Sequence, residues 1–166
     1  NFTADVTTIC EGAPVTFTDL STGTTGSTTY AWDFGNGQVA NSLGPHIIQY
    51  NSSGSFTVSL TITDGASSTQ TFTNYIKVNS PTNGTDVQTA CDTYTWIDGL
   101  TYNASTNTPT FLLTNVAGCD SLVTLNLTIN NSTNGTDVQT ACDTYTWIDG
   151  LTYNASTNTP TFLLTN

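Results

Sequence analysis

Residues 56–63 read Phe-Thr-Val-Ser-Leu-Thr-Ile-Thr, an unbroken alternation of apolar and hydroxyl side chains. A period of two places one face of a β-strand against a hydrophobic core and leaves the other face in water. Asp64-Gly65 follows at once and is typical of a hairpin turn. The run after the turn is expected to return antiparallel, with four side chains on its inner face: Phe72, Asn74, Ile76 and Val78. This segment predicts an all-β protein.

The same alternation extends outward from this hairpin in both directions. Further short runs of this kind cover residues 15–18, 30–34, 93–96, 100–104, 110–114 and 123–129. About six or seven short strands in the first 80 residues or so are the pattern of a β-sandwich. The later runs predict a smaller sandwich, whose thin core is marginal by itself.

The second half of the chain contains a tandem repeat. Residues 82–115 recur without a difference as residues 133–166, at an offset of 51 residues (133 − 82). Arrays of small units build length and surface, because each unit contacts chiefly its neighbours. The repeat divides the chain into residues 1–79, 80–130 and 131–166, the last being a partial copy.

The partial copy lacks the equivalent of residues 116–130, which include the clearest strand of the repeat. We therefore expect this chain to be a piece of a longer protein. Without that strand, a small sandwich has an open edge and an exposed apolar face. We expect residues 133–166 to be completed by a further stretch of their own chain or by a strand from a neighbouring copy. The second route predicts a filament of several copies.

Charge and hydropathy exclude several classes of partner. The formal net charge is −11, and Lys77 is the only lysine or arginine. Binding to nucleic acid or to anionic lipid headgroups needs a basic surface, so neither is expected. Apolar runs of about eighteen residues are absent from the sequence, so no direct membrane insertion is expected.

The cysteines favour an oxidising compartment. Cys91 and Cys119 fall within one repeat, and two cysteines in a small repeat predict a disulfide. A Cys91–Cys119 bond would close a loop of roughly 29 residues and stabilise the repeat by about 3–4 kcal/mol. A Cys119–Cys142 bond between adjacent repeats is the competing pairing, and the partners of Cys10 and Cys142 stay open. The sequence offers no Cys-x-x-Cys or Cys/His pairing that would favour zinc.

The segment Trp32-Asp33-Phe34-Gly35-Asn36-Gly37 resembles the signature of PKD-like domains, in which the fifth position is usually aspartate. The spacing of this segment from residues 15–18 and to residues 50–63 is also similar to that family. The resemblance covers about residues 3–79. It implies an immunoglobulin-like sandwich of an extracellular protein, used as a stalk, a spacer or a carbohydrate-contacting module.

Residues 90–96, 118–122 and 125–129 resemble a cysteine-containing repeat of giant secreted surface proteins of Bacteroidota. That resemblance implies export by the type IX secretion system and a place in adhesins, gliding-associated filaments or other cell-surface appendages. Together the two resemblances predict an immunoglobulin-like PKD sandwich followed by small disulfide-stapled β-sandwich repeats.

Few side chains suggest chemistry. Asp33 and Asn36 are calcium candidates, because oxygen ligands suit that ion, although capping of a turn is the favoured interpretation. No other cofactor is expected. Ser121 lies in an Asp-Ser-Leu sequence that resembles the O-glycosylation motif of Bacteroidota. His46 is the only histidine and has no evident nucleophile beside it, so no catalytic site is expected. Trp96 favours a core position over a sugar-stacking platform.

These observations predict a structural and adhesive segment of a long extracellular fibre or appendage on a bacterial cell surface. Copies of the same chain are the expected partners in a filament or bundle, and surface glycans or other cells are candidates for adhesion. The alternative is a carbohydrate-binding or spacer module of a secreted multidomain protein. An enzyme is not expected.

Overall fold

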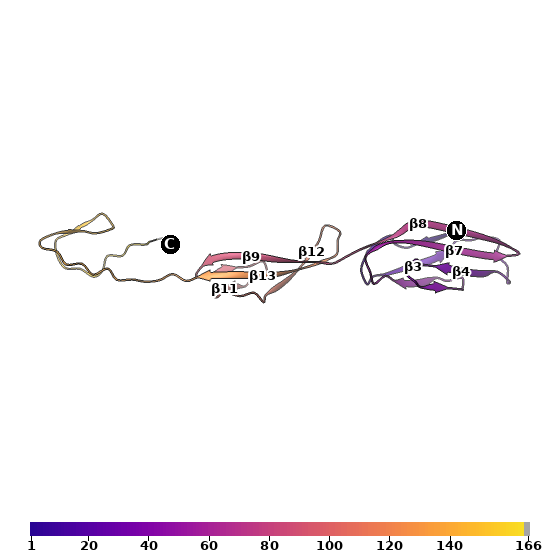
Figure 1. Cartoon of the computed structure of the whole chain (residues 1–166), viewed down its shortest axis with the longest axis horizontal. Helices are drawn as coiled ribbons and strands as arrows, with labels where there is room; N and C mark the ends of the chain where they lie inside the picture. The colour runs from indigo at the N-terminus through magenta and orange to yellow at the C-terminus, as the bar shows by residue number, and fades with distance from the viewer. Residues whose placement is uncertain (165–166) are drawn as a thin grey trace. The chain divides into compact units, whose positions relative to one another are not determined.

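The computed structural model describes residues 1–164, which belong to two compact units, Asn1–Asn131 and Ser132–Asn166. Each unit is described by itself. The described residues contain strands and turns but no helix, which confirms the prediction of an all-β protein (Figure 1). Residues 1–164 accordingly contain no helix that could cross a membrane.

Residues 2–79 form a β-sandwich of two sheets (Figure 1). The smaller sheet has three antiparallel strands in the order β1 (Phe2–Ala4), β3 (Pro14–Asp19), β6 (His46–Gln49). The larger sheet has the order β2 (Thr8–Cys10), β8 (Ala66–Asn79), β7 (Gly54–Asp64), β4 (Thr29–Asp33), β5 (Val39–Ala40). Neighbours in the larger sheet are antiparallel except β2 and β8, which run parallel.

The core of this sandwich lies on the faces that alternation predicts. Its largest fully buried side chains are Trp32, Tyr50, Phe17, Phe34, Leu60 and Ile76. The rings of Trp32 and Phe34 stack with their centroids 5.6 Å apart. The Tyr50 hydroxyl donates a hydrogen bond of 2.8 Å to the Phe34 carbonyl oxygen, so its buried polar group has a partner. Burial raises the pKa of the Tyr50 phenol well above its usual value, and the charge of Asp33 adds to the effect.

Strand β8 departs from the predicted alternation at Asn74. The register shifts between the pairs Phe56↔Ile76 and Val58↔Phe72, so residues 73–75 bulge opposite Thr57. Asn74 has φ of 52° and is exposed, and its backbone N–H donates to the Thr57 hydroxyl at 3.2 Å. The prediction that Asn74 shares the inner face is therefore wrong, because the bulge turns its side chain outward.

Residues 82–130 form a three-stranded sheet and a two-stranded hairpin with their own core (Figure 1). The order of the sheet is β12 (Thr110–Thr114), β13 (Asp120–Asn130), β9 (Thr82–Cys91). Strand β13 pairs antiparallel with β12 and parallel with β9. A hairpin of β10 (Tyr94–Thr95) and β11 (Thr101–Tyr102) supplies Trp96, which packs with buried side chains of β13: Leu125, Leu127 and Ile129.

Residues 133–164 have the sequence of residues 82–113 but fewer strands. The described part of this copy contains one hairpin, β14 (Tyr145–Thr146) with β15 (Thr152–Tyr153). Residues 133–142, whose sequence is that of β9, are not in a strand. Trp147 is half-buried, whereas Trp96 is only 3% exposed. One sequence thus forms two different structures, and β13 is present beside only one of them.

The glycine-rich turn after β4 gives a testable constraint on the sandwich. A Cβ at Gly35, where φ is 76°, would lie 2.3 Å from the Thr57 carbonyl oxygen. We expect Gly35→Ala to lower the free energy of unfolding of the sandwich by at least about 2 kcal/mol, because left-handed backbone alone costs an alanine about 1–2 kcal/mol. Scanning calorimetry of the full chain measures the change.

Gly37→Ala is the matched control for this prediction. Gly37 lies in the same turn with φ of 86°, but a Cβ there would meet nothing within 4 Å. Its cost should be limited to the backbone conformation, about 1–2 kcal/mol. Equal effects of the two substitutions would show that the approach of Gly35 to Thr57 does not constrain the turn.

Candidate functional site

A disulfide joins the first sandwich to the repeat that follows it. Cys10 at the end of β2 and Cys119 before β13 have their sulfur atoms 1.97 Å apart and their Cα atoms 5.6 Å apart. Cys119 is buried, and its sulfur lies 3.7 Å from the carbonyl oxygen of Asn79, the last residue of β8. The bond therefore forms where the chain leaves the first sandwich and enters the repeat.

Local hydrogen bonds hold the loop that carries Cys119. The Asn115 side-chain oxygen accepts from the backbone N–H groups of Ala117 and Cys119, both at 3.0 Å. The amide nitrogen of the same side chain donates to the Ser80 carbonyl oxygen at 3.2 Å. Asn115 thus shapes the loop and ties it to the connection between β8 and β9, which places Cys119 beside Cys10.

The predicted Cys91–Cys119 disulfide is wrong. Strands β9 and β13 are parallel, and their register runs from Ser121↔Thr82 to Asn130↔Cys91. At about 3.3 Å per residue, Cys91 and Cys119 lie roughly 35 Å apart at opposite ends of the sheet. A disulfide needs Cα atoms within about 7 Å, so no such bond forms inside the repeat.

The competing Cys119–Cys142 pairing is also wrong, because Cys119 is bonded to Cys10. The thiols of Cys91 and Cys142 are free and exposed in the described chain. A disulfide is therefore present as predicted, but it connects two parts of the chain that lie 109 residues apart.

The two calcium candidates are engaged in their own turn. The Asp33 carboxylate accepts from the Gly35 backbone N–H at 2.8 Å. The Asn36 side chain accepts from the Gln38 backbone N–H at 3.0 Å and donates to the Gln49 carbonyl oxygen at 3.1 Å. These are the contacts of turn caps. Clusters of three or more acidic, histidine or cysteine side chains are absent from residues 1–164, and calcium at this turn stays a prediction for titration calorimetry.

His46 has a structural position beside two stacked core aromatic rings. Its ring lies edge-on to Trp32 and Phe34, with centroid distances of 5.4 and 5.7 Å. Its Nε2 lies 2.9 Å from the Ser42 carbonyl oxygen, which also accepts from the Trp32 indole N–H at 3.1 Å. Nε2 therefore carries the proton that it donates, and the ring closes one edge of the core.

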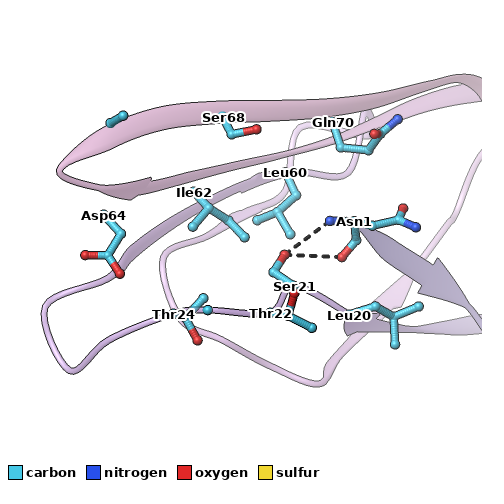
Figure 2. A pocket seen from close by; sticks show the side chains of 12 residues that line it. Asn1, Leu20, Ser21, Thr22, Thr24, Leu60, Ile62, Asp64, Ser68 and Gln70 are labelled. Carbon is cyan, nitrogen blue, oxygen red and sulfur yellow. Dashed lines mark hydrogen bonds between the residues drawn. The ribbon is translucent and has the colours of Figure 1, made fainter.

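The sandwich also has a pocket, of about 390 Å³, between the first residue, the loop around residues 20–24, and strands β7 and β8 (Figure 2). Asp64 is the one carboxylate among its labelled side chains in Figure 2. Hydrogen bonds from Thr28 and Thr25 hold the pKa of the Asp64 carboxyl below its usual value. At the other side, the Asn1 backbone nitrogen donates to the Ser21 hydroxyl at 3.2 Å. The lining is polar but has no paired acid and base.

Comparison with known sequences agrees with this geometry. The sequence profile of the PKD domain matches residues 1–76. Residues 1–76 are a PKD domain. The chain is 38% identical over 72 residues to the pre-pro-metalloprotease PrtV of two strains of Vibrio cholerae serotype O1. That match covers 43% of this chain and 8% of the length of the curated relatives.

Two solved PKD structures are similar to the same part of the chain. The PKD1 domain of Vibrio cholerae PrtV is 36% identical, and the match covers 48% of this chain and 93% of that domain, with a TM-score of 0.39. The PKD1 domain of Vibrio anguillarum Epp is also 36% identical, with 48% and 92% covered and a TM-score of 0.38.

The repeat after the PKD domain has a hydrogen-bonded pair, the buried Trp96 and the half-buried Asp86, that the sequence patterns did not reveal. The Trp96 indole N–H donates to the Asp86 carboxylate at 2.8 Å, and the Gln88 side chain donates to the other oxygen at 2.5 Å. The second copy has the same pair, Trp147 and Asp137, at 2.9 Å. The Trp147 indole N–H holds the pKa of the Asp137 carboxyl below its usual value. Because the two copies are identical in sequence, their comparison carried no signal for this pair.

Asp86→Ala tests how much this pair contributes to the stability of the repeat. Because Trp96 is 3% exposed, the substitution would leave its indole N–H without the Asp86 carboxylate as acceptor, and an unpaired buried donor costs about 1–3 kcal/mol. We expect a loss of that size in the thermal unfolding of the repeat. Asp137→Ala is the matched control, and we expect it to have little effect, since Trp147 is half-buried and water replaces the carboxylate.

The remaining candidates lie in the repeat. Trp96 is buried and offers no sugar-stacking face, as the core interpretation predicted. Ser121 is half-buried at the start of β13, between Thr82 of β9 and Leu113 of β12. Its glycosylation stays a prediction, and the intact mass of the native protein checks it.

Proposed function

We propose that this chain is a structural segment of an extracellular protein, in which tandem β domains extend a fibre or appendage from a bacterial cell surface. The observation that best supports this proposal is the junction between the PKD domain and the repeat. Only Ser80 and Pro81 separate β8 from β9, and the Cys10–Cys119 bond adds a second covalent connection. Two connections of this kind suit a segment that transmits force along the chain.

Three further observations support an extracellular position. Disulfides persist in oxidising compartments, and the Cys10–Cys119 bond is of this kind. The PKD domain is similar to one in PrtV, whose name describes a pre-pro-metalloprotease, a form typical of secreted enzymes. The PKD domain itself is a non-catalytic module. The repeat resembles those of Bacteroidota surface proteins, which supports a cell-surface location and export by the type IX system.

Copies of the same chain are the proposed partners within the fibre. Exposed apolar side chains of the second copy favour pairing with another strand: Val138, Phe162, Leu163 and Leu164. The net charge of −11 opposes close approach of copies unless salt screens it. Surface glycans or other cells are the proposed targets of adhesion.

Electron microscopy of the native object tests this proposal. We expect filaments of uniform width that antibodies against residues 1–130 label along their length. Soluble particles without filaments would contradict a surface fibre.

The second candidate is a carbohydrate-binding or spacer module of a secreted multidomain protein, such as a hydrolase. The observation that favours it is the 38% identity to a domain of a metalloprotease, PrtV. In that case the native protein has hydrolase activity that is independent of residues 1–164, and micrographs show compact particles. Binding of the isolated chain to a glycan array would favour direct carbohydrate contact. Trp96→Ala is unsuitable for that assay, because Trp96 belongs to the core.

A further inference from the structure

The bond between Cys10 and Cys119 depends on the position of Cys10 in its sheet. Strand β2 runs parallel to β8, the last strand of the PKD domain, and Cys10 lies opposite Asn79. The backbone N–H of Glu11 donates to the Asn79 carbonyl oxygen at 3.0 Å. Thr82 starts the next strand three residues later (82 − 79), and the repeat that begins there supplies Cys119.

Cys91 has the same position in the repeat. Strand β9 runs parallel to β13, the last strand of the repeat, and Cys91 lies opposite Asn130. The backbone N–H of Asp92 donates to the Asn130 carbonyl oxygen at 3.0 Å, the distance found for Glu11. Thr133 starts the second copy three residues later (133 − 130), with the sequence that follows Thr82.

We propose that Cys91 forms a disulfide with the second cysteine of the repeat that follows it, the residue that corresponds to Cys119. Cys142 occupies the same position one repeat later. Each repeat is thereby attached to its predecessor by the bond that attaches the first repeat to the PKD domain. The free, exposed thiol of Cys91 is available for this reaction.

The geometry of the repeat excludes the simpler pairing of its two cysteines with each other. Cys91 and Cys119 lie at opposite ends of a parallel pair of strands, roughly 35 Å apart. A following repeat that folds in the same way has its two cysteines equally far apart, so they cannot bond each other and its second cysteine needs a partner outside that repeat. Cys119 has such a partner in Cys10.

The bond forms by oxidation of two thiols. Cys91 and its partner each lose one proton and one electron as the sulfur–sulfur bond forms. A small-molecule disulfide, such as oxidised glutathione, accepts the two electrons and two protons and leaves as two thiols. This inference extends the proposed function but rests on the register and the repeat, so it holds for a fibre and for a spacer alike.

The test uses the full chain extended after residue 166 by a second copy of residues 116–130, which completes the second repeat and adds one cysteine. The protein is refolded with reduced and oxidised glutathione. Free thiols are then counted by maleimide labelling under denaturing conditions and intact mass. Peptide mapping cannot assign the bond, because residues 82–115 and 133–166 yield identical peptides.

Two serine variants of the extended chain make the assignment. If Cys91 bonds the added cysteine, Cys142→Ser has no free thiol and Cys91→Ser has two. Two free thiols in Cys142→Ser with none in Cys91→Ser would show pairing inside the second repeat and overturn the proposal. A disulfide between Cys142 and the added cysteine in the extended chain without substitutions, or a disulfide-linked dimer through Cys91, would overturn it as well. These counts do not depend on whether native filaments are seen.

Discussion

Extending the chain after residue 166 by a second copy of residues 116–130 is expected to fold the second repeat. The added strand should take the place of β13 and pair with residues 133–142, which then form the equivalent of β9. In the first repeat β13 buries Leu125, Leu127 and Ile129, and each such side chain contributes about 1.5–3 kcal/mol. Amide hydrogen exchange in residues 133–142 should slow at least about 100-fold, which corresponds to roughly 3 kcal/mol. Trp147 fluorescence should shift to the blue as its indole becomes buried.

A matched extension separates strand pairing from other effects. In both added segments serine replaces cysteine, so that no disulfide contributes. The control segment also has aspartate in place of the leucines that correspond to Leu125 and Leu127, and it should leave the exchange rates unchanged. A free peptide with the sequence of residues 120–130 tests whether a neighbouring chain can supply the strand. Unchanged amide exchange in residues 133–142 with the extension that keeps both leucines would contradict strand completion.

Replacing Cys10 with serine is expected to destabilise the pair formed by the PKD domain and the first repeat. The bond closes a loop between residues 109 positions apart, and a loop of this length restricts the unfolded chain by about 4–5 kcal/mol in the chain-entropy treatment. We expect the melting temperature of the repeat to fall by several degrees and its transition to separate from that of the PKD domain. Scanning calorimetry under non-reducing conditions measures both effects.

Two variants control for the loss of a cysteine as such. Cys119→Ser removes the other partner of the same bond and should reproduce the effect of Cys10→Ser. Cys91→Ser removes an exposed free thiol and should leave the melting temperature of the chain unchanged. An equal loss in all three variants, or none in any, would show that the Cys10–Cys119 bond does not stabilise the junction.

The alternation of apolar and polar residues was sufficient to predict the class of fold. Alternation in residues 56–63 predicted β7, in which Val58 and Leu60 are buried and Thr61 and Thr63 bond neighbours on the outer face. Side-chain direction along a strand depends only on neighbouring residues, so it can be deduced from the sequence. Asn74 is the exception, because its bulge depends on the register with β7, which involves residues far away in the sequence.

For the candidate sites too, contacts between residues near in sequence were predictable, and contacts between separate elements were not. Turn-capping by Asp33 and Asn36 is a contact within a few residues and was predictable from the turn sequence. The Asp86–Trp96 pair joins β9 to the hairpin, and the distance between these side chains depends on how the two elements pack. The predicted Cys91–Cys119 bond assumed that residues of one repeat lie close together, and the parallel pairing of β9 with β13 separates them.

The sequence by itself determined the all-β class, the PKD turn and the period of the repeat, because each rests on residues that are near one another along the chain. Tertiary structure alone decided which cysteines meet and which residues become strands. Residues 82–91 form β9 and the identical residues 133–142 do not, although no local difference distinguishes them. A strand in a sheet satisfies its backbone hydrogen bonds only through a partner, and β13 supplies that partner to one copy.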